Sequence, residues 1–414
     1  MFHLLVSRKL NPEFCLEVPT RTCLNAYVKA MSLWPYFFFL IFRQKNERRK
    51  KGRKKERTVK REETTIKINQ LLNTNLCFFI SMDDIEPPFE ETYPTLFHNS
   101  TARANDKTLF AVDKECELPL IDLARLNFWS FDQWIEEMAE AASQWGFFQV
   151  MNHGIPQKVF ESMRKEQMKI FHQPFRKKSE QNFMNLSADS YRWGNPKATS
   201  LRQFLWSEAF HIPVADISKL EDESINPRSS IGLFATKAAN LAERLAEYLA
   251  HNLRIKSSYF RDNCLPSSSY LRMNRYPPCP PSFEVLGLIP HTDSDFLTLL
   301  YQDHVGGLQL KKDGRWLSVK PNPDVLIVNV GDLFQALSNG VYKSVEHRVV
   351  SHPKVERYSV AYFYCPSYEA VIESTENIIK PAIYRKFSFR EYKQQIQEDV
   401  RATGNKVGLS RFLL

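Results

Sequence analysis

Between residues 307 and 330 the chain reads GLQLKKDGRWLSVKPNPDVLIVNV. Three short runs rich in Leu, Val and Trp, at 307–311, 315–319 and 325–330, are separated by Asp-Gly and by Pro-Asn-Pro. Such runs predict short strands joined by turns, because Gly and Pro interrupt strands whereas β-branched and aromatic residues favour them. The same pattern begins near Tyr270 and predicts a double-stranded β-helix, a variant of the jelly roll.

Helical patterns flank this strand-rich part. Apolar residues recur at helical spacing over 131–145, 158–172 and 231–253, and a strand-like run lies at 147–151. The apolar stripe of the longest helix consists of Phe234, Ala238, Leu241, Leu245 and Leu249. These patterns predict an α+β protein in which helices flank a jelly-roll core and a helical or mixed domain precedes it.

A last helix is expected near the end of the chain. Ser388 is followed three residues later by Glu391, which is the spacing of a capping box. The side chains expected to face inward from this helix are Phe389, Tyr392, Ile396 and Val400.

A pair of metal-binding side chains precedes the quoted strands. Of the ten histidines in the chain, only His291 is followed two positions later by an acidic residue, Asp293. Residues two apart on a strand point to the same face, so both can reach one ion. His347, within the strand-like VEHRV, offers a third ligand unless it is a core histidine hydrogen-bonded to backbone. Two histidines and one carboxylate are typical of non-haem Fe(II) oxygenases and leave open positions on the metal.

Arg357 and Ser359 are also two residues apart and precede the apolar run VAYF. We expect both to point inward from a strand. A buried arginine needs an anionic partner, because an unpaired buried charge is very costly. Its planar fork fits a carboxylate, and the serine hydroxyl adds a donor. Unless this arginine is exposed on its strand, the pair predicts an acidic co-substrate beside the metal.

From about residue 118 to 414, the chain resembles the plant 2-oxoglutarate and Fe(II)-dependent dioxygenases. The matching segments are LPLID at 118–122, WGFFQVMNHG at 145–154, NRYPPCP at 274–280, HTD at 291–293, GD at 331–332, EHRV at 346–349 and RYS at 357–359. The resemblance implies that His291, Asp293 and His347 are catalytic residues that bind Fe(II).

The same resemblance implies a site for the co-substrate. Arg357, a further expected catalytic residue, would bind the distal carboxylate of 2-oxoglutarate together with Ser359 and the hydroxyl of Tyr276. Dioxygen is the other reactant, and ascorbate is expected to support turnover.

Finer motifs resemble the gibberellin 2-oxidases that act on twenty-carbon gibberellins. They are SYRWG at 190–194, LWSEAFH at 205–211 and LRMNRY at 271–276. The resemblance implies hydroxylation of carbon 2, which inactivates the hormone pathway, with succinate and carbon dioxide as co-products. A rigid apolar polycycle that carries carboxylates needs aromatic walls and cationic anchors. The expected substrate contacts are Tyr191, Trp193 and Trp206 as walls and Arg192 or Arg202 as anchors. Each of these aromatic side chains also fits a role in core packing.

Other functions stay open at this point. The same chemistry on a flavonoid, or at a different gibberellin position, is one alternative, since fold and iron site do not encode the substrate. A non-catalytic binding protein that keeps the fold is another, although the complete ligand set counts against it. A nucleic-acid-binding protein is a third, because residues 43–62 hold 12 Lys or Arg against three Glu, which equals the formal net charge of +9.

That basic tract belongs to a leader unlike the rest of the chain. We expect residues 1–81 to be disordered or to be a non-native extension, with Met82 as the natural start. The nine apolar residues at 34–42 are too few to span a bilayer, which needs about 20. We expect neither a membrane nor a nucleic-acid partner.

The remaining expectations concern organisation and location. Seven cysteines without a Cys-x-x-Cys pair indicate a reducing compartment, the cytoplasm or also the nucleus. The sequence does not indicate an oligomeric state. The expected segments are an amino-terminal segment at 82–116, an amino-terminal dioxygenase domain at 117–225, a connecting long helix at 226–265, the β-helix core at 266–370 and a carboxy-terminal helical segment at 371–414.

Overall fold

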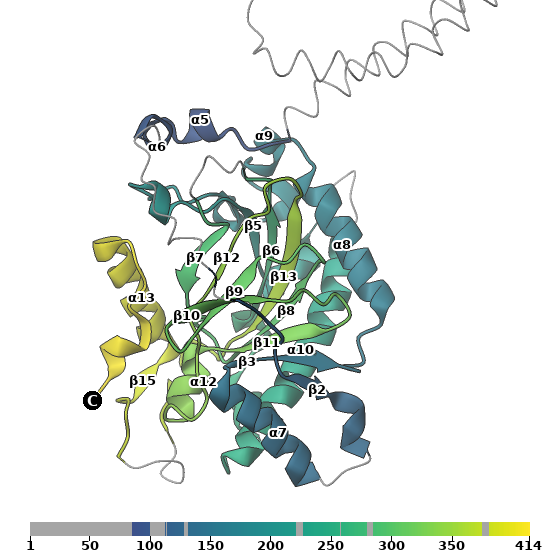
Figure 1. Ribbon diagram of the computed structural model, residues 1–414, viewed down its shortest axis with the longest axis vertical. Coiled ribbons are helices and arrows are strands. Elements are labelled where there is room, and N and C mark those ends of the chain that lie inside the picture. Colours follow the sequence, from purple (N-terminus) through teal and green to yellow (C-terminus); the bar gives the residue numbers. More distant parts are fainter. Residues whose placement is uncertain are drawn as a thin grey trace, which may run out of the picture. The chain divides into compact units, whose positions relative to one another are not determined.

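The computed structural model describes residues 85–99, 112, 114–127, 131–220, 227–256, 258–279, 285–374 and 381–414 (Figure 1). All of them belong to one compact unit, residues 79–414. The expectations for the leader, its basic tract and the start at Met82 lie outside the described residues.

Two β-sheets form the centre of this unit. The larger sheet has the order β2-β3-β11-β8-β13-β6-β5-β4, and the smaller sheet has the order β1-β10-β9-β12-β7. The larger sheet consists of β2 Leu120–Asp122, β3 Phe147–Met151, β4 Tyr191–Trp193, β5 Glu208–Pro213, β6 Tyr270–Tyr276, β8 Leu297–Gln302, β11 Leu326–Val330 and β13 Arg357–Tyr364. The smaller sheet consists of β1 Lys114–Cys116, β7 Leu288–His291, β9 Leu308–Lys312, β10 Arg315–Val319 and β12 His347–Val349.

From β6 onward the chain moves back and forth between the sheets. β6, β8, β11 and β13 join the larger sheet, whereas β7, β9, β10 and β12 join the smaller one. A separate pair is formed by β14 Val371–Ile372 and β15 Phe387–Ser388. This alternation confirms the predicted jelly roll, and the predicted strands at 307–311, 315–319 and 325–330 correspond to β9, β10 and β11.

The described part of the chain also contains helices. They are α5 Phe89–Thr92, α6 Pro94–Asn99, α7 Phe131–Gln144, α8 Gln157–Phe171, α9 Phe175–Lys178, α10 Pro227–Asn252, α11 Tyr259–Asn263, α12 Asp332–Leu337 and α13 Phe389–Thr403. Of these, α7, α8 and α10 lie together beside the larger sheet (Figure 1), and α10 packs against α7, α8, β8 and β13. All five residues of its predicted stripe are buried, and each leucine contributes roughly 1.5–3 kcal/mol. Within the described part of the chain, no helix has the length and apolar character to cross a membrane.

Helix α13 lies on the opposite side of the sheets from α8 (Figure 1). As predicted, the Ser388 hydroxyl caps it by accepting a hydrogen bond from the Glu391 amide at 3.1 Å. The Glu391 carboxylate pairs with Arg385 at 2.8 Å, so only one half of the expected capping box forms. Among the expected inward residues, Phe389 and Tyr392 are buried, whereas Ile396 and Val400 are half-buried.

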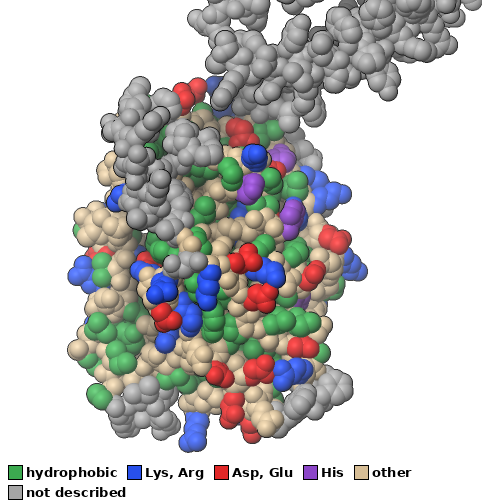
Figure 2. Space-filling view, in the orientation of Figure 1, with side chains coloured by type: hydrophobic (Ala, Val, Ile, Leu, Met, Phe, Trp, Pro, Cys, Tyr) green, Lys and Arg blue, Asp and Glu red, His purple; other side chains and the backbone are tan. Residues whose placement is uncertain are grey.

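The segments expected as separate domains share their sheets. Strand β3 pairs with β11, and β5 pairs with β6, so strands from 117–225 continue the sheet built from 266–370. In the face shown in Figure 2, acidic and basic side chains are interspersed over the described surface. This mixture fits a compact unit whose own charge is nearly balanced.

Candidate active site

A cavity of about 360 Å³ lies between the two sheets. Its lining comes from β5, β6, β8, β11 and β13 of the larger sheet, from β7 with the loop after it, β9 and β12 of the smaller sheet, and from α13 with the segment after it. It contains the three expected metal ligands together with Arg357, Ser359 and Tyr276. Residues that are 81 positions apart along the chain therefore share one chamber.

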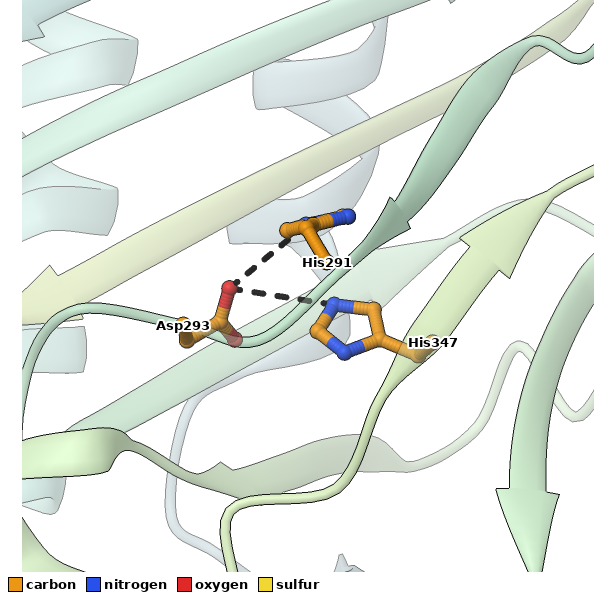
Figure 3. Close-up of side chains that lie close together, drawn as sticks. All are labelled: His291, Asp293 and His347. Atoms are coloured by element: carbon orange, nitrogen blue, oxygen red, sulfur yellow. Dashed lines mark ion pairs between the residues drawn. The ribbon is translucent and has the colours of Figure 1, made fainter. Parts of the chain in front are cut away.

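His291, Asp293 and His347 converge on one point of this cavity (Figure 3). Strand β12 pairs with β7 so that His347 lies directly opposite His291, with 4.3 Å between ring centroids. Asp293 Oδ1 is 3.7 Å from Nε2 of each histidine. One ligand atom from each residue lies within 4.8 Å of the other two. Cross-strand pairing thus brings together residues from distant parts of the sequence.

Backbone carbonyl groups fix which nitrogen of each imidazole faces the carboxylate. Nδ1 of His291 donates a hydrogen bond to Ile289 O at 2.9 Å, and Nδ1 of His347 donates to Val345 O at 3.1 Å. Burial, followed by the proximity of His347, lowers the pKa of His291 to about 3. A neutral imidazole whose Nδ1 carries the proton has its lone pair on Nε2. The histidines therefore direct lone pairs toward Asp293.

Asp293 is held by two neighbours on the larger sheet. Its Oδ2 accepts hydrogen bonds from Thr298 Oγ1 at 2.8 Å and from Asn329 Nδ2 at 3.1 Å. Burial raises the pKa of Asp293, whereas these hydrogen bonds lower it, and the pKa lies below its usual value. The carboxylate is thus charged, with Oδ1 free to face the histidines.

The separation of the three donors fits a shared cation. At 3.7 Å the carboxylate oxygen is too far from either nitrogen for a hydrogen bond. Two metal–ligand bonds of about 2.1 Å each span such a gap. Two neutral imidazoles and one carboxylate, without a thiolate, suit Fe(II) with open coordination positions. The residues present therefore fit the metal that the sequence implies.

The backbone at Asp293 differs from the expectation. Strand β7 ends at His291, so Asp293 lies in the following loop and not on the same strand. The loop is held from outside the strand, because Asp332 N donates to Asp293 O at 3.0 Å and Thr292 Oγ1 donates to the Asp332 carboxylate at 3.0 Å. Lys406 adds an ion pair to Asp332 at 2.6 Å and a hydrogen bond to Thr292 O at 2.8 Å. Contacts from later segments therefore replace strand geometry in orienting the carboxylate.

Arg357 is buried without a carboxylate partner among the described residues. Its guanidinium donates to Gln302 Oε1 at 2.7 Å and to Ser359 Oγ at 3.4 Å, and its Cζ lies 4.7 Å from the Tyr276 ring centroid. Its Nε has no hydrogen-bond partner. Because a buried guanidinium is costly without an anion, this end of the cavity fits the carboxylate of 2-oxoglutarate. Tyr276 is directly opposite Arg357 on the paired strands β6 and β13.

None of the five expected substrate contacts lines the cavity. Trp193 and Trp206 belong to a separate buried cluster around Phe204. The hydroxyl of Tyr191 donates to Glu208 at 2.5 Å. The two expected anchors, Arg192 and Arg202, are exposed.

Three residues that support the site were absent from the expectations. Thr298 and Asn329 hold Asp293, and Gln302 accepts from Arg357. A sequence signal existed for Asn329, which is the single polar residue in the apolar run VLIVNV. For Thr298 and Gln302 the alternation along β8 gave no sign of their partners.

Solved structures with similar architecture include a plant oxygenase. A crystal structure of JOX2 in complex with 2OG, Fe and JA matches with a TM-score of 0.59 at 32% identity, covering 68% of this chain and 85% of that one. The rice dioxygenase for auxin oxidation matches with a TM-score of 0.59 at 29% identity, covering 72% and 100%. The fold and the donor set together define a non-haem Fe(II) oxygenase.

Sequence comparison gives the family. Residues 267–366 match the 2OG-Fe(II) oxygenase superfamily, and residues 118–229 match the family described as non-haem dioxygenase in morphine synthesis N-terminal. The chain is 55% identical over 340 residues to gibberellin 2-beta-dioxygenase 8 of Arabidopsis thaliana, covering 80% of this chain and 99% of that protein. It is 47% identical over 311 residues to gibberellin 2-beta-dioxygenase 6 of Oryza sativa subsp. japonica, covering 72% and 85%. The chain belongs to the 2OG-Fe(II) oxygenase superfamily, and it is a dioxygenase that uses Fe(II) and 2-oxoglutarate.

Proposed function

We propose that this enzyme hydroxylates carbon 2 of gibberellins, in particular twenty-carbon precursors, and so inactivates the hormone pathway. Succinate and carbon dioxide are the co-products. The proposal is supported by relatives of 45 to 55% identity that are named gibberellin 2-beta-dioxygenases. The observation that carries the chemistry is the single cavity that holds both the His291, Asp293 and His347 cluster and the unpaired Arg357.

The iron-binding role falls to three atoms. His291 Nε2, His347 Nε2 and Asp293 Oδ1 bind Fe(II), because these are the lone pairs that the surrounding hydrogen bonds leave facing one another. Bound iron and 2-oxoglutarate together supply the oxidant that inserts oxygen into a C–H bond. The chain's own part is to hold the donors on one side and leave the other side open to the cavity.

The co-substrate role falls to the other end of the chamber. Arg357 binds the distal carboxylate of 2-oxoglutarate through its guanidinium, with the Ser359 hydroxyl as a second donor. The Tyr276 ring lies against the guanidinium, and its hydroxyl is a further donor to the carboxylate. Closure of this end by buried side chains excludes water from the charged pair, which strengthens it.

The test is reconstitution of the full-length chain with Fe(II), 2-oxoglutarate and ascorbate, followed by oxygen and a twenty-carbon gibberellin. We expect succinate together with a product heavier by one oxygen atom, whose hydroxyl mass spectrometry and NMR place on carbon 2. A His347→Ala protein prepared in parallel should yield neither product.

The same assay separates the alternatives. A panel with a nineteen-carbon gibberellin, a flavonoid, a jasmonate and an auxin shows which acid stimulates succinate release most. Hydroxylation of a different panel member, without gibberellin turnover, would refute the gibberellin assignment while keeping the dioxygenase. Iron binding without any substrate-stimulated succinate would favour a binding protein.

A further inference from the structure

A second group of cations lines the cavity away from Arg357. Arg272 on β6 and Lys393 on α13 both face this chamber, with His211 of β5 beside them. Arg272 Nε donates to Asn274 Oδ1 at 3.0 Å, which leaves the rest of its guanidinium available. Lys393 Nζ lies 5.7 Å from the Tyr270 ring centroid. Among the described residues, no carboxylate forms an ion pair with Arg272 or Lys393.

The other two cations of the cavity, Lys406 and Arg357, each have an assigned anionic partner. Lys406 is neutralised within the chain by its ion pair with Asp332. Arg357 is assigned to 2-oxoglutarate. Arg272 and Lys393 are therefore the cavity cations whose charge neither the described chain nor the co-substrate compensates.

The positive potential of this region affects its neighbours. Partial desolvation comes first, followed by the charges of Arg272, Lys393 and Arg192, in lowering the pKa of His211, although its side chain stays exposed on β5. Burial likewise lowers the pKa of Arg272 itself. Two partly buried cations without an anion are costly, so an anionic ligand that binds here is stabilised.

The strand register separates this region from the 2-oxoglutarate end. Strands β6 and β13 pair so that Tyr276 is opposite Arg357 and Arg272 is opposite Ala361. Arg272 thus lies four residues along β6 from Tyr276, which corresponds to roughly 13 Å. Even-numbered residues of β6 share the cavity face, so one strand supplies both levels. A five-carbon diacid is too short to extend from the Arg357 level to the Arg272 level and also reach the metal.

The surroundings of Arg272 provide apolar walls and space. Ala361, directly opposite, has a small side chain that leaves room beside the guanidinium. At the next level the rings of Phe363 and Tyr270 stack at 4.4 Å with an interplanar angle of 11°. Ile396 from α13 adds an aliphatic surface. Cations beside stacked rings suit a bulky apolar molecule that ends in a carboxylate.

We propose that Arg272 and Lys393 bind a carboxylate of the substrate and so orient its apolar body against Tyr270 and Phe363. The inference rests on the proposed function in taking that substrate to be a diterpenoid acid. It assigns specificity for an acidic polycycle to β6 and α13. Neither Arg192 nor Arg202 lines the cavity, so neither is assigned to the carboxylate.

The test compares an acid with its methyl ester. In Arg272→Gln and Lys393→Gln proteins, the KM for a gibberellin acid should rise roughly 10- to 100-fold, because each loses a charge-assisted hydrogen bond. The KM for 2-oxoglutarate and the substrate-independent release of succinate should stay unchanged. An ester that masks the bound carboxylate should be a poor substrate for the wild type and respond little to either substitution.

Two further variants keep the test decisive if Arg272→Gln folds poorly. Arg272→Lys should recover part of the lost affinity, since it keeps the charge. Arg401→Gln removes one positive charge from the exposed end of the same helix, α13, and should leave all kinetic constants unchanged. Monomethyl esters made at each carboxyl group identify which one the site binds.

The outcomes separate this inference from the proposed function. An equal rise in KM for the acid and for every ester would overturn the carboxylate-binding role of Arg272 and Lys393, because a change in packing alone would then explain it. A raised KM for 2-oxoglutarate in Arg272→Gln would also overturn it. Failure of the wild type on all gibberellins would refute the proposed function alone. The same variants would then be assayed with whichever panel acid stimulates succinate release. A loss seen with that acid and not with its ester would support carboxylate binding by Arg272 and Lys393, and the absence of such a loss would overturn it.

Discussion

The arginines on the two faces of strand β6 differ in whether a carboxylate of the chain pairs with them. Arg275, on the face away from the cavity, pairs with Glu208 at 2.7 Å, with Glu356 at 2.9 Å and also with Glu86. Arg272, on the cavity face, has no carboxylate partner within the described chain. The strand is the same, and only the direction of the side chain differs.

The difference shows how to separate a structural charge from a binding charge. Glu208 is fully buried, yet it meets Arg275 on one oxygen and Lys178, at 2.5 Å, on the other. Every charge in this ion network finds its opposite within the chain, so the network stabilises the fold and needs no ligand. The cavity instead contains cations and metal-binding lone pairs that the chain leaves unmatched. Such groups are available to bind a ligand.

The largest effect is expected at the metal ligands. His291→Ala, Asp293→Ala or His347→Ala removes one of three donors, so we expect loss of iron from the purified protein and no detectable turnover. Thermal unfolding without metal should change little. Metal analysis and succinate assays measure the first effect. His304→Ala, at an exposed histidine, is the control and should behave as the wild type. Retained iron in all three variants would contradict the assignment.

In the ion network around Glu208 we expect a loss of folding stability, in contrast to the loss of iron binding at the metal ligands. Glu208→Gln leaves the buried Lys178 and Arg275 short of a negative charge, so we expect a loss of about 3–5 kcal/mol in the free energy of unfolding. Denaturant titration measures it. Glu117→Gln breaks an exposed ion pair with Lys320 and should not shift the transition. Adding Lys178→Met to Glu208→Gln should recover part of the loss. An unchanged denaturation midpoint for Glu208→Gln alone would contradict the view that this ion network stabilises the fold.

A binding charge should matter for its ligand more than for the fold. Arg357→Leu removes the partner of a buried carboxylate, so 2-oxoglutarate should bind about 2–5 kcal/mol more weakly. The KM for 2-oxoglutarate measures this loss, and thermal unfolding should stay close to that of the wild type. Normal affinity for 2-oxoglutarate would refute the role given to this arginine.

The smallest effect concerns the helix that brings Lys393 to the cavity. Ser388→Ala removes the cap of α13 and should cost about 1 kcal/mol of stability. Ser388→Asp, which can still cap, should stay near the wild type. Thermal unfolding measures both. An equal loss in the two variants would show that the hydroxyl acts through something other than the cap.

The sequence predicted the elements whose pattern is local. The short runs separated by Gly and Pro in 307–330 identified β9, β10 and β11 to within a residue or two, and the stripe of α10 is buried throughout. His291, Asp293 and His347 were proposed from spacing and resemblance, and strand pairing places His347 opposite His291. The loop geometry at Asp293 was missed, since it depends on Asp332 and Lys406 from later in the chain.

The cavity walls were less predictable. Trp193 and Trp206, chosen from motifs in the amino-terminal part, pack around Phe204, and Tyr191 packs against Phe210, because no local pattern tells which face of a sheet surrounds a ligand. A usable signal was present in the alternation along β6. Stepping back by twos from Tyr276 leads through Asn274 to Arg272 and Tyr270. Lys393 had no such signal, because its position depends on how α13 docks.

The link between Lys406 and the loop at Thr292 also sets an order of events during synthesis. These two residues are 114 positions apart, so the loop leaves the ribosome well before its lysine anchor is made. At about 5–20 residues per second, the interval is roughly 6–23 s. During that time the loop that carries Asp293 lacks its last support, and once Asp332 has been added its carboxylate has no lysine to neutralise it until Lys406 is made. The nascent enzyme should therefore acquire a rigid metal loop late, which protease protection of stalled chains of increasing length would reveal.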